Sequence, residues 1–208
     1  MNYVAKKMMP KSRMITYFNT LDNNVQEEVL IRVDELVKEE QEYCDKGNYE
    51  HMCNILCLLA IYEVLQKHGM SEEEAFTTVG SEMHKFVQPY KEKFQKLSKK
   101  GWFWSLIKKI VPIGFKKKSG IGWRYTWHKD TPKDEFRFET NECIYAKIFK
   151  KRNLTKLGPL FCQCDVINYG QLHKIDFQRT KTLCYGDDEC NFIFIRKNDE
   201  NFERTAAR

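Results

Sequence analysis

Hydrophobic positions in the first half of the chain recur every three or four residues, which is the spacing of one face of an α-helix. The segment that begins at Asn23 or Asn24 carries a single apolar stripe and predicts an amphipathic helix, with one of these asparagines as its N-cap. A second helix, over about residues 49–68, is apolar on most sides and is expected to be the central helix of a bundle. Residues 1–20 show no such period, and we expect them to be loosely ordered or to form a short strand.

A third helix is predicted to run from Ser71 toward Lys99. Ser71 and Glu74 have the spacing of a capping box, in which each residue satisfies a backbone amide of the other. Gly69, just before it, is expected to end the second helix. Pro89 is expected to kink or split the third helix, because proline removes a backbone donor and clashes with the preceding turn.

Residues 99–118 combine apolar residues at helical spacing with seven lysines and no acidic residue. We expect a basic amphipathic helix that is interrupted near Pro112 and Gly114. Three roles fit this pattern. The segment could pack on the core with a solvated lysine face, cover a pocket as a lid with Trp102 or Trp104 facing inward, or make peripheral contact with an anionic membrane surface.

From residue 120 the hydrophobic pattern changes to every second position, which is typical of β-strands. GWRYTWHKD and DEFRFET predict a hairpin, the next two segments predict helices, and IDFQRTKTL with CNFIFIRK predicts a second antiparallel pair. This order indicates an α+β fold, with an N-terminal helical bundle packed on a C-terminal antiparallel sheet that carries helices on one face. We assign residues 1–119 to the helical region, 120–197 to an α+β region with a ligand pocket, and 198–208 to a disordered tail.

Composition narrows the choice of partners. The net charge of +6 comes largely from residues 99–118, rather than from arginines scattered among aromatic residues, so we expect no nucleic-acid partner. The first residues carry no apolar stretch of signal-peptide length, and no run of 18 apolar residues occurs. The eight cysteines are therefore expected to be reduced thiols in a cytoplasmic protein. Cys53 and Cys57 lie four residues apart in an apolar helix and are expected to pack as small hydrophobic residues.

Residues 161–195 concentrate the side chains that can carry chemistry, with four cysteines, one histidine and five acidic residues in 35 positions. Cys162 and Asp165 lie three residues apart on a predicted helix and therefore share a face, where the carboxylate could act as a base or as an orienting group. Cys190 begins the last strand and could face Cys184 across the hairpin or the helix that bears Cys162.

The hairpin before Cys190 has its own pattern. On a continuous strand, Thr180 and Thr182 would share one face, with Arg179 on the other. Gly186 suits a turn position that needs a positive φ, and Asp187 is expected to bond its own backbone in an Asx-turn. A nearby Arg179 or Lys181 would lower the pKa of a cysteine and favour a thiolate nucleophile.

Metal and histidine chemistry are weaker alternatives. The cysteines and His173 suggest zinc, but the spacings C-x-C and C-x5-C do not match structural zinc motifs, so we expect no metal and no other cofactor. His128 lies beside Trp127 on a predicted strand and is a candidate for the pocket wall.

Three segments together resemble the L-2-amino-thiazoline-4-carboxylic acid hydrolase family: ECIYAKIFK, LGPLFCQCD and RTKTLCYGDDECNF. The resemblance runs from about Trp123 to Lys197. The family pattern has a cysteine in the first helix, Cys-x-x-Asp in the second, then Arg-Thr, Gly-Asp and Cys-x-Phe. The matching residues are Cys143, Cys162 with Asp165, Arg179 with Thr180, Gly186 with Asp187, and Cys190 with Phe192.

This resemblance implies that water is added to a 2-aminothiazoline carboxylate, which opens the ring carbon–sulfur bond and yields N-carbamoyl-cysteine. It further implies a carboxylate that activates water or a thiol, an arginine that holds the substrate carboxylate, and a cysteine nucleophile. The candidate catalytic residues are Cys162, Asp165, Cys190 and Asp187, and the candidate substrate-binding residues are Arg179, Thr180, Thr182, Cys143 and His128.

The hairpin is also similar to the small-ligand sensory domains related to vinyl reductases. This second resemblance implies a protein that binds an apolar or aromatic small molecule without chemistry. Cysteines and a carboxylate can hold zinc in such sensors. Here Thr182 stands eight positions before Cys190, where a ligand cysteine would be expected. A hydrolase and a binding protein therefore both remain open from the sequence, and each requires a small-molecule partner.

Overall fold

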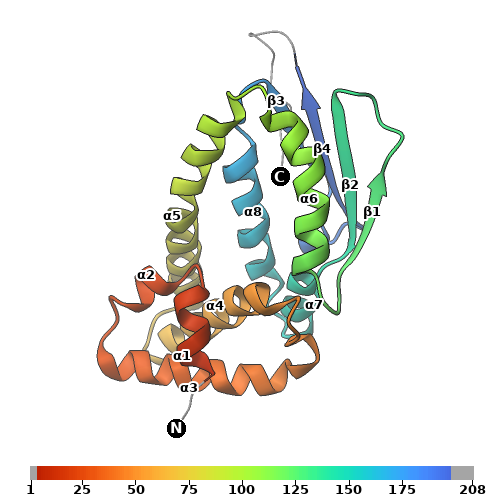
Figure 1. Cartoon of the computed structure of the whole chain (residues 1–208). Helices are drawn as coiled ribbons and strands as arrows, with labels where there is room; N and C mark the ends of the chain where they lie inside the picture. Colours follow the sequence, from red (N-terminus) through yellow and green to blue (C-terminus); the bar gives the residue numbers. More distant parts are fainter. Residues whose placement is uncertain (1–3, 198–208) are drawn as a thin grey trace. The chain divides into compact units, whose positions relative to one another are not determined.

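The computed structural model describes residues 4–197, so the expected tail at 198–208 lies outside the described residues. The chain divides into two compact units, residues 1–86 and 87–208. Figure 1 colours the chain by position, from red at the N-terminus to blue at the C-terminus. The helical first half and the strands after residue 120 confirm the predicted α+β class. None of the described helices combines the length and hydrophobicity needed to span a bilayer.

The first unit is built on a helix that is buried almost all round. The central helix α4 places Cys53 and Cys57 with no exposed surface, as expected for small hydrophobic residues. The apolar stripe of α3 packs against α4, and Arg32 of α3 donates to the Glu63 carboxylate of α4 at 2.5 Å. The helices of this unit are α1 (Ala5–Met8), α2 (Ile15–Phe18), α3 (Asn23–Glu39), α4 (Tyr49–Lys67) and the first part of α5 (Glu72–Ser98), with short 3₁₀ turns at Met9–Lys11 and Gln41–Tyr43.

The expectation of a loose or strand-like N-terminus was wrong within the described residues. The segment contains the short helices α1 and α2 and, after α1, the 3₁₀ turn at Met9–Lys11. Ala5, Met8 and Met14 are buried, and the Ala5 amide donates to the Asp34 carboxylate of α3 at 2.9 Å. Burial of separate apolar residues against α3 and α4 therefore orders a segment that has no clear period of its own.

The predicted capping box at the start of α5 is confirmed. The Glu74 amide donates to Ser71 Oγ at 3.3 Å, and the Ser71 amide donates to the Glu74 carboxylate at 2.9 Å. The carboxylate also accepts the Ser71 hydroxyl, and these bonds lower the pKa of Glu74. Each residue therefore satisfies an amide that the first turn of the helix leaves without a helical partner.

The two helical prolines do not divide their helices, so the expected interruption near Pro112 was wrong. The helix α5 runs through Pro89 without being split, and α6 (Phe103–Lys118) runs through Pro112 without interruption. Both helices bury apolar side chains on the core of the second unit, Leu97 from α5 and Val111 from α6 among them. This burial offsets the roughly 3 kcal/mol that an internal proline costs a helix.

In the described part of the second unit, four antiparallel strands form one sheet in the order β1-β2-β4-β3. Phe138 of β2 lies opposite Phe192 of β4, and their rings stack with centroids 4.7 Å apart. Figure 1 shows α6 and α8 alongside this sheet, and side chains of both helices pack into the same aromatic cluster. The elements are β1 (Arg124–His128), β2 (Glu135–Glu142), α7 (Ile144–Lys151), α8 (Gly158–Tyr169), β3 (Ile175–Gln178) and β4 (Cys190–Arg196), with 3₁₀ turns η3 (Thr155–Leu157) and η4 (Leu183–Tyr185).

The capping box yields a stability prediction. Ser71→Ala removes the hydroxyl that accepts the Glu74 amide, and we expect the free energy of unfolding to fall by about 1 kcal/mol. Ser81→Ala, in the same helix, is the matched control, because the Ser81 hydroxyl only donates to the Thr78 carbonyl on an exposed surface. Urea denaturation followed by circular dichroism measures both. Equal effects of the two substitutions would contradict a capping role.

Candidate active site

Five segments of the second unit converge at one end of the sheet. The helix α8 carries Cys162 and Asp165, and the loop after β3 carries Arg179. The 3₁₀ turn η4 carries Cys184 and contacts both α7 and α8. Cys143 lies immediately before α7, and Cys190 is the first residue of β4.

A buried arginine joins the loop to α8. Arg179 is 1% exposed, and its Nη1 donates to the Asp165 carboxylate at 2.9 Å while its Nη2 donates to the Cys162 carbonyl at 2.7 Å. Its guanidinium carbon also lies 5.8 Å and 5.3 Å from the ring centroids of Phe177 and Phe192. A charge at this depth is stable only when it is paired and hydrogen-bonded. The arrangement gives Arg179 internal partners, so its geometry is that of a positioning residue rather than an open clamp for a substrate carboxylate.

The chain around Arg179 is not a continuation of β3. The Asn191 carboxamide oxygen accepts the amides of Thr180 at 3.0 Å and Lys181 at 2.8 Å, and its nitrogen donates to the Thr180 hydroxyl at 2.9 Å. Thr180 is exposed whereas Thr182 is fully buried, so the expectation that they share a strand face was wrong. The side chain of Asn191 replaces the regular ladder at this point and turns the backbone.

The turn that follows is held by Asp187. The Thr182 amide donates to the Asp187 carboxylate at 2.7 Å, and the Asp187 amide donates to the Thr182 carbonyl at 3.2 Å. Gly186 has a φ of 92°, as predicted for the turn. Asp187 does bond backbone, but its partner is the amide five residues earlier. This contact gives it a structural part in shaping the loop.

The convergence brings the thiols of Cys143, Cys162 and Cys184 into hydrogen-bonding contact. Cys190 is close by, with its sulfur accepting the Leu183 amide at 3.2 Å. The cluster depends on close backbone approach. A Cβ at Gly158 would lie 2.9 Å from the Cys184 sulfur, so the first turn of α8 admits η4 only because residue 158 is glycine.

The thiols of this cluster differ in acidity. A hydrogen bond from Cys184 lowers the pKa of Cys162; burial opposes this, and the charge of Arg179 adds to the lowering. The Cys162 sulfur also lies 3.9 Å from the Thr182 hydroxyl oxygen, which can donate to a thiolate. Hydrogen bonds with Cys143 and Cys162, together with burial, raise the pKa of Cys184. Burial, followed by the nearness of Cys143, raises the pKa of Cys190. Cys162 is therefore the thiol that this environment favours as a thiolate.

The cluster is mostly enclosed but reaches solvent at one edge. Cys162 is 9% exposed, whereas the Asp165 side chain is 36% exposed and shares the same face of α8. Thr182 lies beneath with no exposed surface. The arrangement can therefore supply a thiolate, a proton donor in Cys184 and a carboxylate that water can reach.

Other residues suggested by the sequence lie elsewhere. His128 is the last residue of β1 and forms an ion pair with Glu139. The first residue of β1, Arg124, is the one that lies opposite Glu142, next to Cys143, so His128 is at the strand end away from the cysteine cluster. Trp104 is buried in the aromatic cluster and Trp102 is half exposed. His173 is exposed in the turn before β3.

The sequence also raised zinc as an alternative, which would require several ligand side chains to lie around one point. Within residues 4–197, no three side chains among histidine, cysteine, aspartate and glutamate are arranged to hold a metal ion. The sulfurs of the cluster bond to one another and to Leu183 and Thr182 instead.

The sequence and structure were compared with solved structures, curated proteins and protein families. A solved structure with some likeness is the NMR structure of the H-NOX domain from Shewanella oneidensis in the Fe(II)CO ligation state, which is 12% identical. The alignment covers 85% of this chain and 97% of that chain with a TM-score of 0.29, too low to support an argument. No curated protein matches the sequence. A family model described as L-2-amino-thiazoline-4-carboxylic acid hydrolase matches residues 42–194, which include every cysteine of the cluster. The chain therefore belongs to the L-2-amino-thiazoline-4-carboxylic acid hydrolase family.

Proposed function

We propose that this protein hydrolyses a small cyclic amidine of the 2-amino-thiazoline carboxylate type, with Cys162 as the nucleophile. The observation that carries the proposal is the place of Cys162 beside the buried Arg179, which donates to the Cys162 carbonyl at 2.7 Å, and 3.9 Å from the Thr182 hydroxyl. These neighbours and the thiol of Cys184 lower the pKa of Cys162 and favour a thiolate within the matched region. A thiolate is the reactive form of cysteine, and it is favoured here at a lower pH than in an ordinary thiol.

In the first proposed step, the Cys162 thiolate attacks the ring carbon that carries the amino group. A new carbon–sulfur bond forms, and the bond from that carbon to the ring sulfur breaks. The ring sulfur keeps the electron pair and takes the proton of Cys184. Cys184 gives up its proton more easily at this stage. Cys143 and Cys162 both raise the pKa of Cys184, and Cys162 is no longer a charged thiolate once it is bonded to the substrate. The product of the step is an isothiourea attached to Cys162.

In the second proposed step, water attacks the same carbon. Asp165 accepts a proton from the water, since its carboxylate lies at the solvent edge on the face of α8 that bears Cys162. The bond to Cys162 then breaks, with the electron pair returning to that sulfur, and the second proton of the water passes to the former ring nitrogen, which gives the carbamoyl group. The proton held by Asp165 returns to Cys184 through solvent. One water has been added, and the product is an N-carbamoyl amino acid with a free thiol.

Arg179 supports both steps without touching substrate in this proposal. Its bond to Asp165 orients the carboxylate, its bond to the Cys162 carbonyl fixes α8 against the loop, and its charge favours the Cys162 thiolate. The substrate carboxylate is therefore expected to meet other groups at the exposed edge.

Replacement of Cys162 tests the nucleophile. We expect Cys162→Ser to reduce hydrolysis of L-2-amino-thiazoline-4-carboxylate by roughly a thousandfold or more, because a hydroxyl is a poor nucleophile without a strong base. Cys164→Ser is the matched control, since this buried thiol on the same helix donates to the Leu160 carbonyl and stays outside the cluster. Chromatographic assay of the N-carbamoyl product measures both. Full turnover by Cys162→Ser would exclude the covalent route, and binding of the substrate by wild type without turnover would overturn the proposed function in favour of a binding protein.

The acidity of Cys162 yields a pH prediction. Alkylation by iodoacetamide requires the thiolate, so its rate rises with pH through the pKa, and the lowered pKa of Cys162 places that rise at lower pH than for an ordinary cysteine. Cys184→Ala removes the largest cause of the lowering and should move the profile to higher pH. Mass spectrometry of peptides identifies the alkylated residue. The measurement is repeated in a Cys164→Ala background, which removes the other thiol of α8. If Cys184→Ala leaves the pH profile of alkylation unchanged, Cys184 does not lower the pKa of Cys162.

The second step can be isolated with Asp165→Asn, which keeps an oxygen for Arg179 but removes the base. We expect slower turnover, by about a hundredfold, and accumulation of the enzyme with the substrate mass added at Cys162. Intact-protein mass spectrometry after rapid acid quench detects this species. If the variant turns over as fast as wild type, Asp165 is not the base; if turnover slows and no adduct forms, water attacks the ring directly.

A further inference from the structure

The helix α6 has two faces of different surroundings. One face packs into the aromatic core of the second unit, with Trp104, Ile107 and Phe115 among its contacts. The other faces solvent and is also apolar. Trp102, Leu106, Ile110 and Ile113 recur at four, four and three residues, and each keeps between 38% and 55% of its surface exposed. This spacing places the four on one side of the helix, so they form a continuous apolar row. Apolar residues exposed singly and at random would not share one side.

Positive charge lies on the same side. Lys109, Lys116 and Lys117 are exposed and alternate with the apolar row. No acidic residue occurs anywhere in residues 99–118. Lys108 is different, since its ammonium donates to the carbonyls of Lys133 and Glu135 next to the sheet. The exposed face of α6 therefore combines apolar side chains with charge of a single sign.

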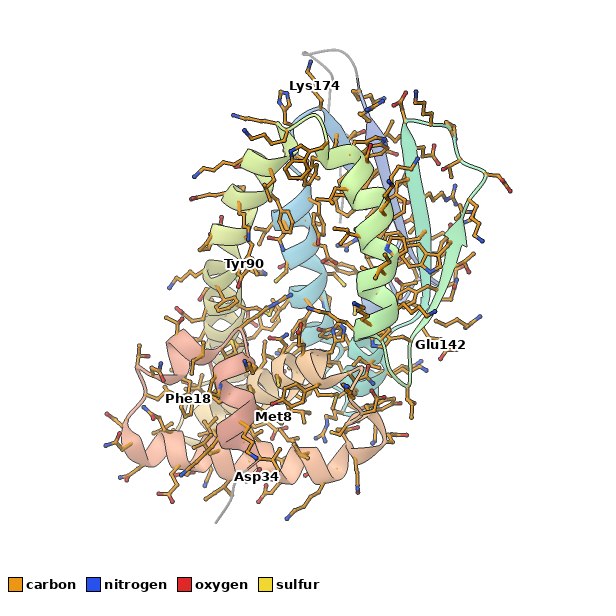
Figure 2. The ribbon with its side chains drawn as sticks, viewed as in Figure 1. Met8, Phe18, Asp34, Tyr90, Glu142 and Lys174 are labelled. Carbon is orange, nitrogen blue, oxygen red and sulfur yellow. The ribbon has the colours of Figure 1, made fainter. Side chains whose placement is uncertain are left out.

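A basic depression of about 390 Å³ lies where α6 begins. Its wall includes Arg196, which pairs with Asp134, but no acidic residue belongs to the lining. Figure 2 shows Lys174, one of the lining residues, at the opposite end of the second unit from Glu142, which precedes Cys143 of the cysteine cluster. The lining residues are Ser98, Lys99, Lys100, Gly101, Trp104, His173, Lys174, Ile175, Arg196 and Lys197.

We propose that the exposed face of α6 docks this protein on an anionic phospholipid bilayer, and that the basic residues around the depression at its start add to the attraction. Helices of this kind lie in the plane of the interface, with the apolar row in the acyl boundary and the lysines among the headgroups. Trp102 at the start of the row suits the headgroup level. A second copy of the chain is disfavoured as the occupant, because a twofold contact through α6 would set the lysines of one copy against those of the other.

Co-sedimentation with vesicles tests this proposal. The full chain is expected to bind vesicles of phosphatidylcholine mixed with phosphatidylglycerol, to bind pure phosphatidylcholine far more weakly, and to be released by high salt but not by millimolar inorganic phosphate. Lys109→Glu with Lys116→Glu should lower the apparent partition coefficient at least about twenty-fivefold, at about fivefold for each lysine lost. Ile110→Ser with Ile113→Ser should weaken binding as well, at unchanged charge.

The control reverses two exposed lysines away from α6, Lys93→Glu with Lys150→Glu, and should bind almost as wild type. Neither pair of lysine substitutions is expected to change hydrolysis in the absence of vesicles, so failure of docking and failure of the proposed chemistry are distinguishable. The proposal is overturned if anionic vesicles do not bind the protein, or if both charge-reversal pairs weaken binding equally. It is also overturned if size-exclusion chromatography shows a dimer that the α6 substitutions dissociate.

Discussion

The buried guanidinium of Arg179 is the constraint on which the site depends. Its two hydrogen bonds reach the carboxylate of Asp165 and the carbonyl of Cys162, which are one turn apart on α8. A cation at this depth that lost its partner would cost about 3–5 kcal/mol. The loop after β3 is therefore held against α8, and with it the turn that carries Thr182 and Cys184.

Burial alone does not decide the state of a cysteine in this protein. Cys53 and Cys162 are both buried, yet the pKa of Cys53 is raised to about 11, mainly because burial disfavours its charged form. At Cys162 the pKa is lowered, because a neighbouring thiol donates to the sulfur and Arg179 contributes a positive charge. The difference lies in the partners that tertiary structure supplies, and the proposed nucleophile follows from those partners rather than from exposure.

Local spacing predicted much of the fold. The period of the apolar residues located the long helices and the strands, and the i, i+3 relation placed Cys162 and Asp165 on one face. It failed where a distant residue overrides the local rule. The Asn191 carboxamide ends the ladder of β3, and core packing carries α6 through Pro112. The contact of Cys184 with Cys162 was beyond prediction, because it depends on how the 3₁₀ turn η4, which begins five residues after β3 ends, meets the start of α8.

The glycine at the start of α8 occupies a position where a larger residue would change the site. Alanine in place of glycine inside a helix ordinarily adds about 0.5–1 kcal/mol of stability. At Gly158 the same methyl group would collide with Cys184, the residue whose proton sets the acidity of its neighbour. Alanine at residue 158 would therefore stabilise the helix but displace Cys184, and the sulfur of Cys162 would become less reactive.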